Sequence, residues 1–182
     1  LLSFVSYLVE GAVGDWSALY LFEDKGIVIE EAVMGVMLFN GTMCIGRLLG
    51  NRLGKHLTSK QVVVGGYLLG SIAMGLIVFL PGHASMYTYL LLGISLAMIV
   101  PNLFSAMGEQ NVIPMTQAVA TSTMLGYMGI LMGPALIGFI AHGTSLTVAF
   151  IVLTTLLVVS AGIGKYAYHL MSKDCGLSEE QI

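Results

Sequence analysis

Six long apolar runs divide this chain into segments of membrane-spanning length. A hydrocarbon core of about 30 Å requires roughly 20 apolar residues per helix. Short breaks that contain Gly, Pro, Asn and charged residues separate the runs, as turns at a membrane surface would. The sequence therefore predicts an all-α membrane protein, with residues 1–182 forming one six-helix domain and residues 172–182 a cytoplasmic tail. The predicted spans are 1–22, 31–50, 61–80, 86–107, 117–140 and 145–169.

Composition excludes several other classes of protein. The chain is 57% hydrophobic and 9% charged, whereas soluble domains carry about 25% charged residues. Its net charge of -3 offers no basic face for nucleic acid, and its four His and two Cys are too scattered for metal-ligand spacing. No nucleophile, base and orienting group are assembled, so we expect no enzyme, metal or cofactor. Leu1 already lies within an apolar run, which suggests a fragment or numbering that omits earlier sequence.

The distribution of Lys and Arg predicts the orientation in the membrane. Basic residues in short loops stay on the cytoplasmic side. Of the seven Lys and Arg residues, only Lys25 lies in a loop after the first, third or fifth run. We therefore expect the N-terminus, the second and fourth loops and the tail to be cytoplasmic, in a cell (inner) membrane. The other six are Arg47, Arg52, Lys55, Lys60, Lys165 and Lys173.

The first run contains two acids, Glu10 and Asp15. Each costs roughly 2.5 to 3.5 kcal/mol at a helix centre, so this helix should lie against protein or a water-filled cavity. Glu10 shares a polar face with Tyr7, which favours proton or substrate coupling, with a structural hydrogen-bonded acid as the alternative. Asp15 points about 140° away from Glu10 around the helix axis. It is a second candidate for coupling at an outer gate, or a structural acid that caps or pairs. Trp16 is either a pathway aromatic or a packing residue.

Polar stripes recur on the second, fourth and fifth runs. They contain Asn40 and Arg47, then Asn102 and Glu109, then Tyr127. We predict solute contacts at Tyr7, Trp16, Asn40, Asn102 and Tyr127, with interhelical packing as the alternative for the two Asn residues. The third and sixth runs lack ionisable or amide residues at mid-depth and should face lipid. The six runs thus follow the order polar, polar, plain twice. This order indicates a 3+3 inverted repeat.

Small residues spaced four apart predict close helix contacts, and internal packing is favoured over oligomerisation. Pro101 and Pro134 interrupt backbone hydrogen bonding and predict kinks in the fourth and fifth runs. The spaced glycines are Gly66 with Gly70, Gly129 with Gly133, and Gly46 with Gly50 and Gly54.

Residues 47–56, RLLGNRLGKH, resemble the signature loop of the major facilitator superfamily (MFS), Gly-x-Leu-small-Asp-Arg-x-Gly-basic-basic. Arg47 stands in place of the first Gly and Asn51 in place of the Asp. Residues 126–141 and 10–17 are similar to the eleventh helix and to the start of the C-terminal half of fucose-permease-like members. The resemblance implies that the six runs correspond to helices seven to twelve, with the first and fourth lining a central cavity.

These patterns together predict the C-terminal half of a proton-coupled secondary transporter for a small polar solute such as a sugar. Its polar faces need a cover, which an N-terminal half or a second copy would provide. Arg47 and Arg52 are expected to pair with Glu109 at a cytoplasmic gate, with solvated loop charges as the alternative. An efflux pump for amphipathic compounds and a non-transporting membrane module remain as other interpretations.

Overall fold

The computed structural model describes the backbone of residues 1–53, 57–109 and 114–175 and the side chains of 1–50, 57–108 and 114–171. All regular structure in these ranges is helical, and the seven segments match the six predicted runs, with the fourth run divided in two. The last helix continues to Cys175, so the predicted tail begins in helix, and residues 176–182 lie outside the described part. The segments are α1 (Leu2–Glu23), α2 (Ile29–Leu53), α3 (Ser59–Phe79), α4 (Gly82–Ala97), α5 (Ile99–Glu109), α6 (Met115–Gly143) and α7 (Leu146–Cys175).

Five stretches within the described residues are long and apolar enough to cross a membrane: Ile29–Gly50, Ser59–Phe79, Gly82–Gly108, Met115–Gly143 and Leu146–Met171. The third of these comprises α4 and most of α5. The remaining long helix, α1, has the length to cross a membrane but contains two acids, Glu10 and Asp15, and is not among these five stretches.

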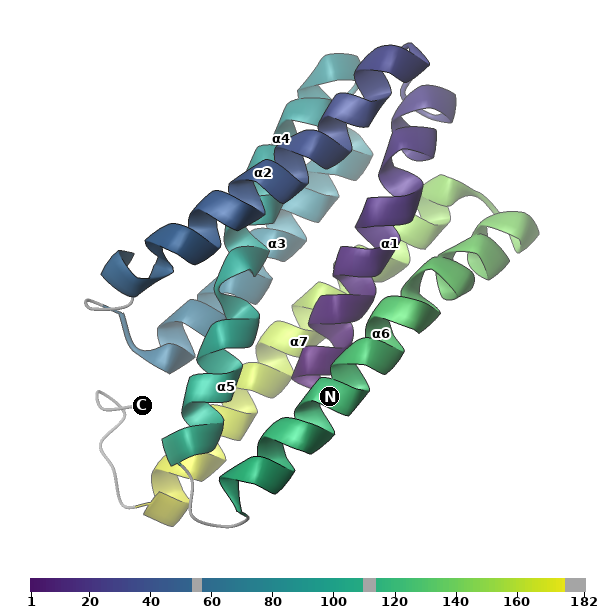
Figure 1. Ribbon diagram of the computed structural model, residues 1–182. Helices are drawn as coiled ribbons and strands as arrows, with labels where there is room; N and C mark the ends of the chain where they lie inside the picture. Colours follow the sequence, from purple (N-terminus) through teal and green to yellow (C-terminus); the bar gives the residue numbers. More distant parts are fainter. Residues whose placement is uncertain (54–56, 110–113, 176–182) are drawn as a thin grey trace.

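The helices form two layers in Figure 1, with α2, α1 and α6 nearer the viewer and α3, α4 and α7 behind them. The main packing partners are α1 with α6, α2 with α4, and α3 with α7 and α4. No contact joins α2 to α6 in the described part of the chain, because α1 lies between them. Tyr20 of α1 and Phe150 of α7 stack at 4.2 Å between ring centroids and help to hold the layers together.

The predicted kink in the fourth run is confirmed as an interruption at Met98, between α4 and α5. Pro101 has no N–H for the carbonyl of Ala97, four residues earlier, so regular α-helix cannot continue there. By contrast, α6 continues as one helix through Pro134. The corresponding carbonyl, that of Ile130, packs against Gly11, where an added Cβ would lie 2.7 Å from the oxygen.

Glycines bring backbones into contact within the bundle, as predicted for internal packing. A Cβ at Gly66 of α3 would lie 2.7 Å from the backbone oxygen of Ser95 in α4. Cβ atoms at Gly129 and Gly133 of α6 would overlap the backbone oxygens of Phe4 and Leu8 in α1. These close approaches fix α1 against α6, and hence the position of the polar residues on α1. Gly54 lies outside the described residues.

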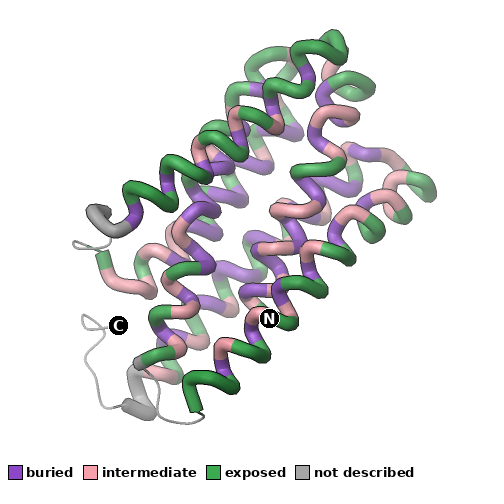
Figure 2. The backbone as a smooth tube through the Cα atoms, in the orientation of Figure 1, coloured by how far each residue is buried: buried purple, intermediate pink, exposed green. Residues whose placement is uncertain are grey.

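Burial is uneven among the helices, as Figure 2 shows. Only 28% of the α2 span and 22% of the α6 span are buried, against 44% for α3, 50% for α4 with α5 and 39% for α7. Beyond its first turn, α3 exposes large side chains that are apolar, such as Leu68 and Ile72, whereas α2 and α6 also expose Arg47 and Tyr127. We call the exposed surface of α1, α2 and α6 that carries these polar side chains the open face.

Candidate functional site

An ion pair between α1 and α2 lies on the open face. Nη2 of Arg47 lies 3.0 Å from Oε1 and 3.3 Å from Oε2 of Glu10. The Glu10 side chain is 20% exposed and the Arg47 side chain 43% exposed, so the acid is the more enclosed partner. The sequence predicted Glu109 as the partner of Arg47, but this structure pairs Arg47 with Glu10. The side chains of Arg52 and Glu109 lie outside the described residues, and their pairing stays a prediction.

Two tyrosines extend this cluster. The Tyr7 hydroxyl lies within electrostatic range of Glu10, Arg47 and Tyr127. The ring of Tyr7 rests against Gly126 of α6, where any side chain would displace it. Tyr127 follows Gly126 and is 66% exposed. Four of the residues predicted from the sequence therefore lie along α1 and the helices on either side of it, α2 and α6, and they supply an acid, a guanidinium and two phenols.

Asn40 lies on the same face of α2 as Arg47, two turns or about 10 Å away along the axis. Its side chain is exposed, and its amide nitrogen donates to the backbone oxygen of Val36 at 3.0 Å. That bond uses one amide hydrogen and leaves the acceptor oxygen for another group. Cys44, also exposed, lies between the two along the helix. Asn40 can therefore contact a solute that extends from Arg47 toward the other end of α2.

Asn102 has a local structural role. Its amide nitrogen donates to the backbone oxygen of Met98 at 2.8 Å, and its own backbone N–H reaches the same oxygen at 3.2 Å. Met98 is the residue at which the helix is interrupted. The side chain thus supports the first turn of α5 after the break. It remains half-buried, and a role in solute contact stays a prediction.

Asp15 and Trp16 lie apart from the cluster, nearer the other end of α1. Asp15 is exposed, whereas Trp16 donates from Nε1 to the backbone oxygen of Pro134 at 2.9 Å and packs against Gly138. Trp16 lies six positions after Glu10, which is about 9 Å along the helix. Trp16 also lines a cavity of about 460 Å³ together with Glu23, Asp24, His142 and Ser145. The observed contacts match the packing interpretation of Trp16 and leave its role in solute binding untested.

Sequence reasoning missed Tyr67, on a helix that it treated as plain scaffold. Tyr67 is fully buried, and its hydroxyl donates to the backbone oxygen of Leu2 at 2.8 Å and accepts from Ser6 Oγ at 2.7 Å. A second buried bond joins Ser3 Oγ to Ser122 Oγ at 2.6 Å. These bonds attach the first turns of α1 to α3 and α6. The signal was available, because a Tyr inside an apolar run needs a partner for its hydroxyl.

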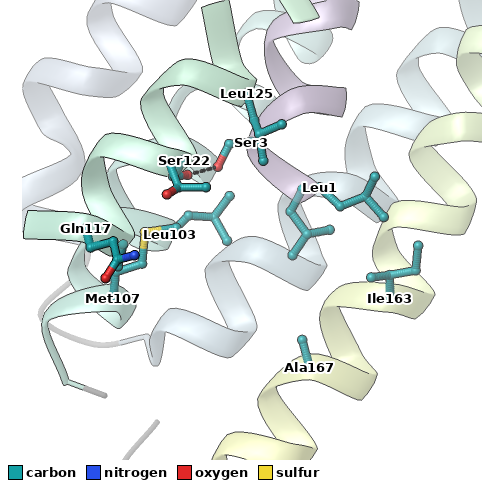
Figure 3. Close-up of a pocket in the computed structure, with 12 residues that line it drawn as sticks. Leu1, Ser3, Leu103, Met107, Gln117, Ser122, Leu125, Ile163 and Ala167 are labelled. Carbon is teal, nitrogen blue, oxygen red and sulfur yellow. Dashed lines mark hydrogen bonds between the residues drawn. The ribbon is translucent and has the colours of Figure 1, made fainter. Parts of the chain in front are cut away.

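A larger cavity of about 550 Å³ lies beside the first residues of α1 (Figure 3). Its walls come from α1, α5, α6 and α7 and are mostly apolar, with the Ser3–Ser122 hydrogen bond as a polar element. None of the predicted site residues whose side chains the structure describes lines it. This cavity is therefore distinct from the ion-paired cluster.

The loop between α1 and α2 is attached to the bundle at the end opposite the first residues of α1. Lys25 Nζ donates to the backbone oxygen of Val78 at 2.6 Å and lies 5.3 Å from the centre of the Tyr20 ring. Desolvation lowers the pKa of Lys25, against the opposing effect of Asp24. Thr147 in turn donates to Asp24 at 2.9 Å. These bonds hold the ends of α1, α3 and α7 together.

Comparison with known proteins reveals related transporters, although no family model matches the chain. It is 42% identical over 163 residues to an uncharacterised MFS-type transporter of Yersinia pestis, an alignment that covers 88% of this chain and 42% of that protein. It is 29% identical over 166 residues to membrane protein MosC of Rhizobium meliloti, covering 90% of this chain and 41% of that protein. An uncharacterised transporter of Sinorhizobium fredii is 28% identical over 156 residues, covering 84% and 41%.

The chain spans about two fifths of the length of the curated relatives it matches. The similarity extends over 84–90% of the chain. Together with five helices of membrane-spanning length and apolarity, these relationships identify an integral multi-pass membrane protein that is homologous to transporters.

Proposed function

We propose that this chain is the C-terminal half of an MFS secondary transporter of the fucose-permease-like kind. In this proposal the transporter moves a small polar solute, such as a sugar, together with protons by alternating access and catalyses no chemical reaction. Support comes from the homologous transporters, which are more than twice as long as this chain. The part of each relative that this chain does not cover is long enough for a second six-helix half. A second copy of this chain could fill the same place.

The observation that carries the proposal is the Glu10–Arg47 ion pair on the open face. A carboxylate at mid-depth in a membrane helix is costly unless it has a partner. Glu10 has such a partner and remains partly accessible, so proton uptake and pair separation can occur together. A conformational change that alters water access to this face would thereby couple proton binding to transport.

The open face also requires a covering surface, which supports alternating access. Large side chains such as Met37, Tyr127 and Leu131 are 61%, 66% and 76% exposed. A facing half would bury them on one side of the membrane at a time, with the solute between the halves. In this proposal Arg52 and Glu109 close the cytoplasmic side, both termini face the cytoplasm, and the membrane is the inner one.

The helix packing is compatible with the proposed 3+3 repeat, with α1 to α3 as one triplet and α4/α5, α6 and α7 as the other. In such a repeat α1 corresponds to α4 with α5, and α6 corresponds to α2. The contact between α1 and α6 therefore corresponds to the contact between α4 and α2. Both contacts are among the most extensive in the bundle. This correspondence supports α1 as the sixth membrane-spanning helix, equivalent to α4 with α5.

Replacement of Glu10 by Gln in the full-length transporter tests the coupling role. In proteoliposomes, E10Q should lose uptake driven by a proton gradient while it retains solute exchange at equal pH on both sides. E30Q, at an exposed acid in the first turn of α2, is the matched control and should leave both activities unchanged. If D15N rather than E10Q abolishes proton-driven uptake, Asp15 is the coupling acid. Proton-driven uptake unchanged in both variants would refute proton coupling through either acid.

A second candidate, efflux of amphipathic compounds, is favoured by the methionines of the open face. Met37, Met124 and Met128 are 61%, 67% and 44% exposed, and Met side chains adapt to ligands of varied shape. A thermal-shift screen of the full-length transporter separates the two candidates. Stabilisation by sugars supports the polar-solute transporter, whereas stabilisation by hydrophobic cations supports the pump.

A further inference from the structure

We infer that the transported solute carries a carboxylate group, which Arg47 binds in place of Glu10 when Glu10 is protonated. This inference rests on the proposed proton-coupled transport and specifies the class of solute more narrowly. The solute would be a small hydroxylated carboxylic acid, such as a sugar acid, in place of a neutral sugar.

The geometry of the ion pair leaves much of the guanidinium available. Both contacts to Glu10 come from one nitrogen, Nη2 of Arg47. A guanidinium has five N–H donors in a planar fork, and this fork matches the two oxygens of a carboxylate. Arg47 is also the more exposed partner, at 43% against 20% for Glu10. A solute that approaches from the open face therefore meets the guanidinium before it meets the acid.

Protonation of Glu10 would leave one positive charge in this cluster, which favours an anion. Within the side chains that the structure describes, the other Lys and Arg residues lie outside α1, α2 and α6: Lys25 in the α1–α2 loop, Lys60 in the first turn of α3 and Lys165 on α7. When Glu10 takes up a proton, Arg47 loses its observed partner. An unpaired guanidinium within the membrane is costly. A neutral sugar offers hydrogen bonds but no compensating charge, whereas a carboxylate restores the pair.

This exchange of partners links solute and proton binding. Glu10 carboxylate plus one proton becomes a neutral carboxylic acid, and the solute carboxylate takes its place beside the guanidinium. The charge of the cluster is the same before and after, and one proton is bound for each carboxylate. By linkage, each ligand raises the affinity for the other by the same factor. The carboxylate thus supplies a physical reason for co-transport that a neutral solute lacks.

The residues around the ion pair suit the remainder of such a solute. Tyr7 interacts electrostatically with both members of the pair and with Tyr127, and Asn40 presents an amide two turns away along α2. Hydroxyl groups on the solute can exchange hydrogen bonds with all three side chains. The cluster therefore provides one charged anchor and several neutral polar contacts.

Matched pairs of solutes provide the test on the purified full-length transporter. D-glucuronate is compared with D-glucose, and D-galacturonate with D-galactose, as sodium salts or with equal sodium chloride. The readout is the shift in melting temperature between pH 5.5 and pH 8. We expect at least one acid to stabilise the protein, more strongly at the lower pH, and its neutral partner to have little effect. Equal stabilisation by the neutral partners, or none by either acid, would overturn the inference.

Variants at the pair make the test specific. R47Q should weaken binding of the stabilising acid about tenfold or more, because a charge-assisted contact is lost. K165Q removes a charge from α7 as the matched control and should leave binding unchanged. E10Q, which mimics the protonated acid, covers the case in which R47Q fails to fold. It should bind the acid at pH 8 as well as at pH 5.5, and a persistent pH dependence would contradict the exchange of partners.

The outcomes distinguish this inference from the proposed function. Proton-driven uptake of a neutral sugar that depends on Glu10 would leave the proposed function intact and remove the carboxylate inference. Acid binding that depends on Arg47, without proton-driven uptake of that acid, would retain the binding site and refute proton-coupled transport.

Discussion

Substitution of two adjacent glycines on α3 gives the sharpest test of how tightly this bundle is packed. A Cβ at Gly66 would lie 2.7 Å from the Ser95 backbone oxygen and 2.8 Å from Ile99 Cγ1, whereas a Cβ at Gly65 would meet no atom within 4 Å. Ordinary contacts begin at 3.4 Å, so G66A requires α3 and α4 to separate by about 0.7 Å, the difference between 3.4 and 2.7 Å. The obstructing atom belongs to the backbone and cannot rotate away.

Overpacking of this kind costs about 1 to 3 kcal/mol. Replacement of Gly by Ala within a helix returns up to about 1 kcal/mol, because Ala loses less backbone entropy on folding. G65A should therefore stabilise the protein slightly, and G66A should destabilise it by about 1 to 2 kcal/mol. Both variants replace Gly by Ala at adjacent positions of the same helix. The effect of helix propensity is therefore the same in both, and the difference between them reports packing.

The measurement is the melting temperature of the full-length transporter in detergent, read from the fraction that remains monodisperse on size-exclusion chromatography after heating. We expect G66A to melt at least about 2 °C below G65A. Equal melting temperatures, or a more stable G66A, would refute the close approach of α3 and α4. The same result would also leave the abundance of glycine in the membrane-spanning helices without a packing explanation.

Three further predictions concern single side chains. Y67F should destabilise the protein by about 1 to 3 kcal/mol in thermal unfolding, because the Leu2 carbonyl and Ser6 hydroxyl lose a buried partner; Y166F, at a position 65% exposed, should be neutral. W16F should cost about 1 kcal/mol, measured in the same assay, through loss of the hydrogen bond to Pro134. Exposed Cys44, in a C175S background, should react with a maleimide several-fold more slowly when a bound solute closes the transporter; an unchanged rate would place it outside the pathway.

Much of the fold could be predicted because a bilayer imposes simple requirements on length and polarity. The division of the fourth run into α4 and α5 followed from Pro101, whose missing N–H acts locally. The close packing of Gly66 and Gly129 followed from their spacing along a helix. In each case the cause lies within one helix or in a general property of membrane helices. Sequence periodicity captures such causes well.

The site could be predicted only in part. Tyr7, Glu10 and Tyr127 were found because they lie on polar stripes, and stripes are a property of single helices. The pairing of Arg47 with Glu10 was not found, because it depends on the relative rotation and axial offset of α1 and α2. Tyr67 was missed for a different reason: its phenol ring is apolar enough to be counted with the aliphatic residues around it. Its hydroxyl had to be considered separately.

The Glu10–Arg47 pair also connects the insertion of α1 with the function proposed for it. Either charge alone destabilises a membrane helix, and the contact offsets part of both costs. The double variant E10Q/R47Q should consequently be more stable than the two single variants imply. Both side chains are partly exposed, at 20% and 43%, so we expect a coupling free energy near the lower end of the range for contacting residues, about 1 kcal/mol. Additive effects on the free energy of unfolding would show that water, and not the partner, solvates each charge, and the exchange of partners on protonation would then lose its physical basis.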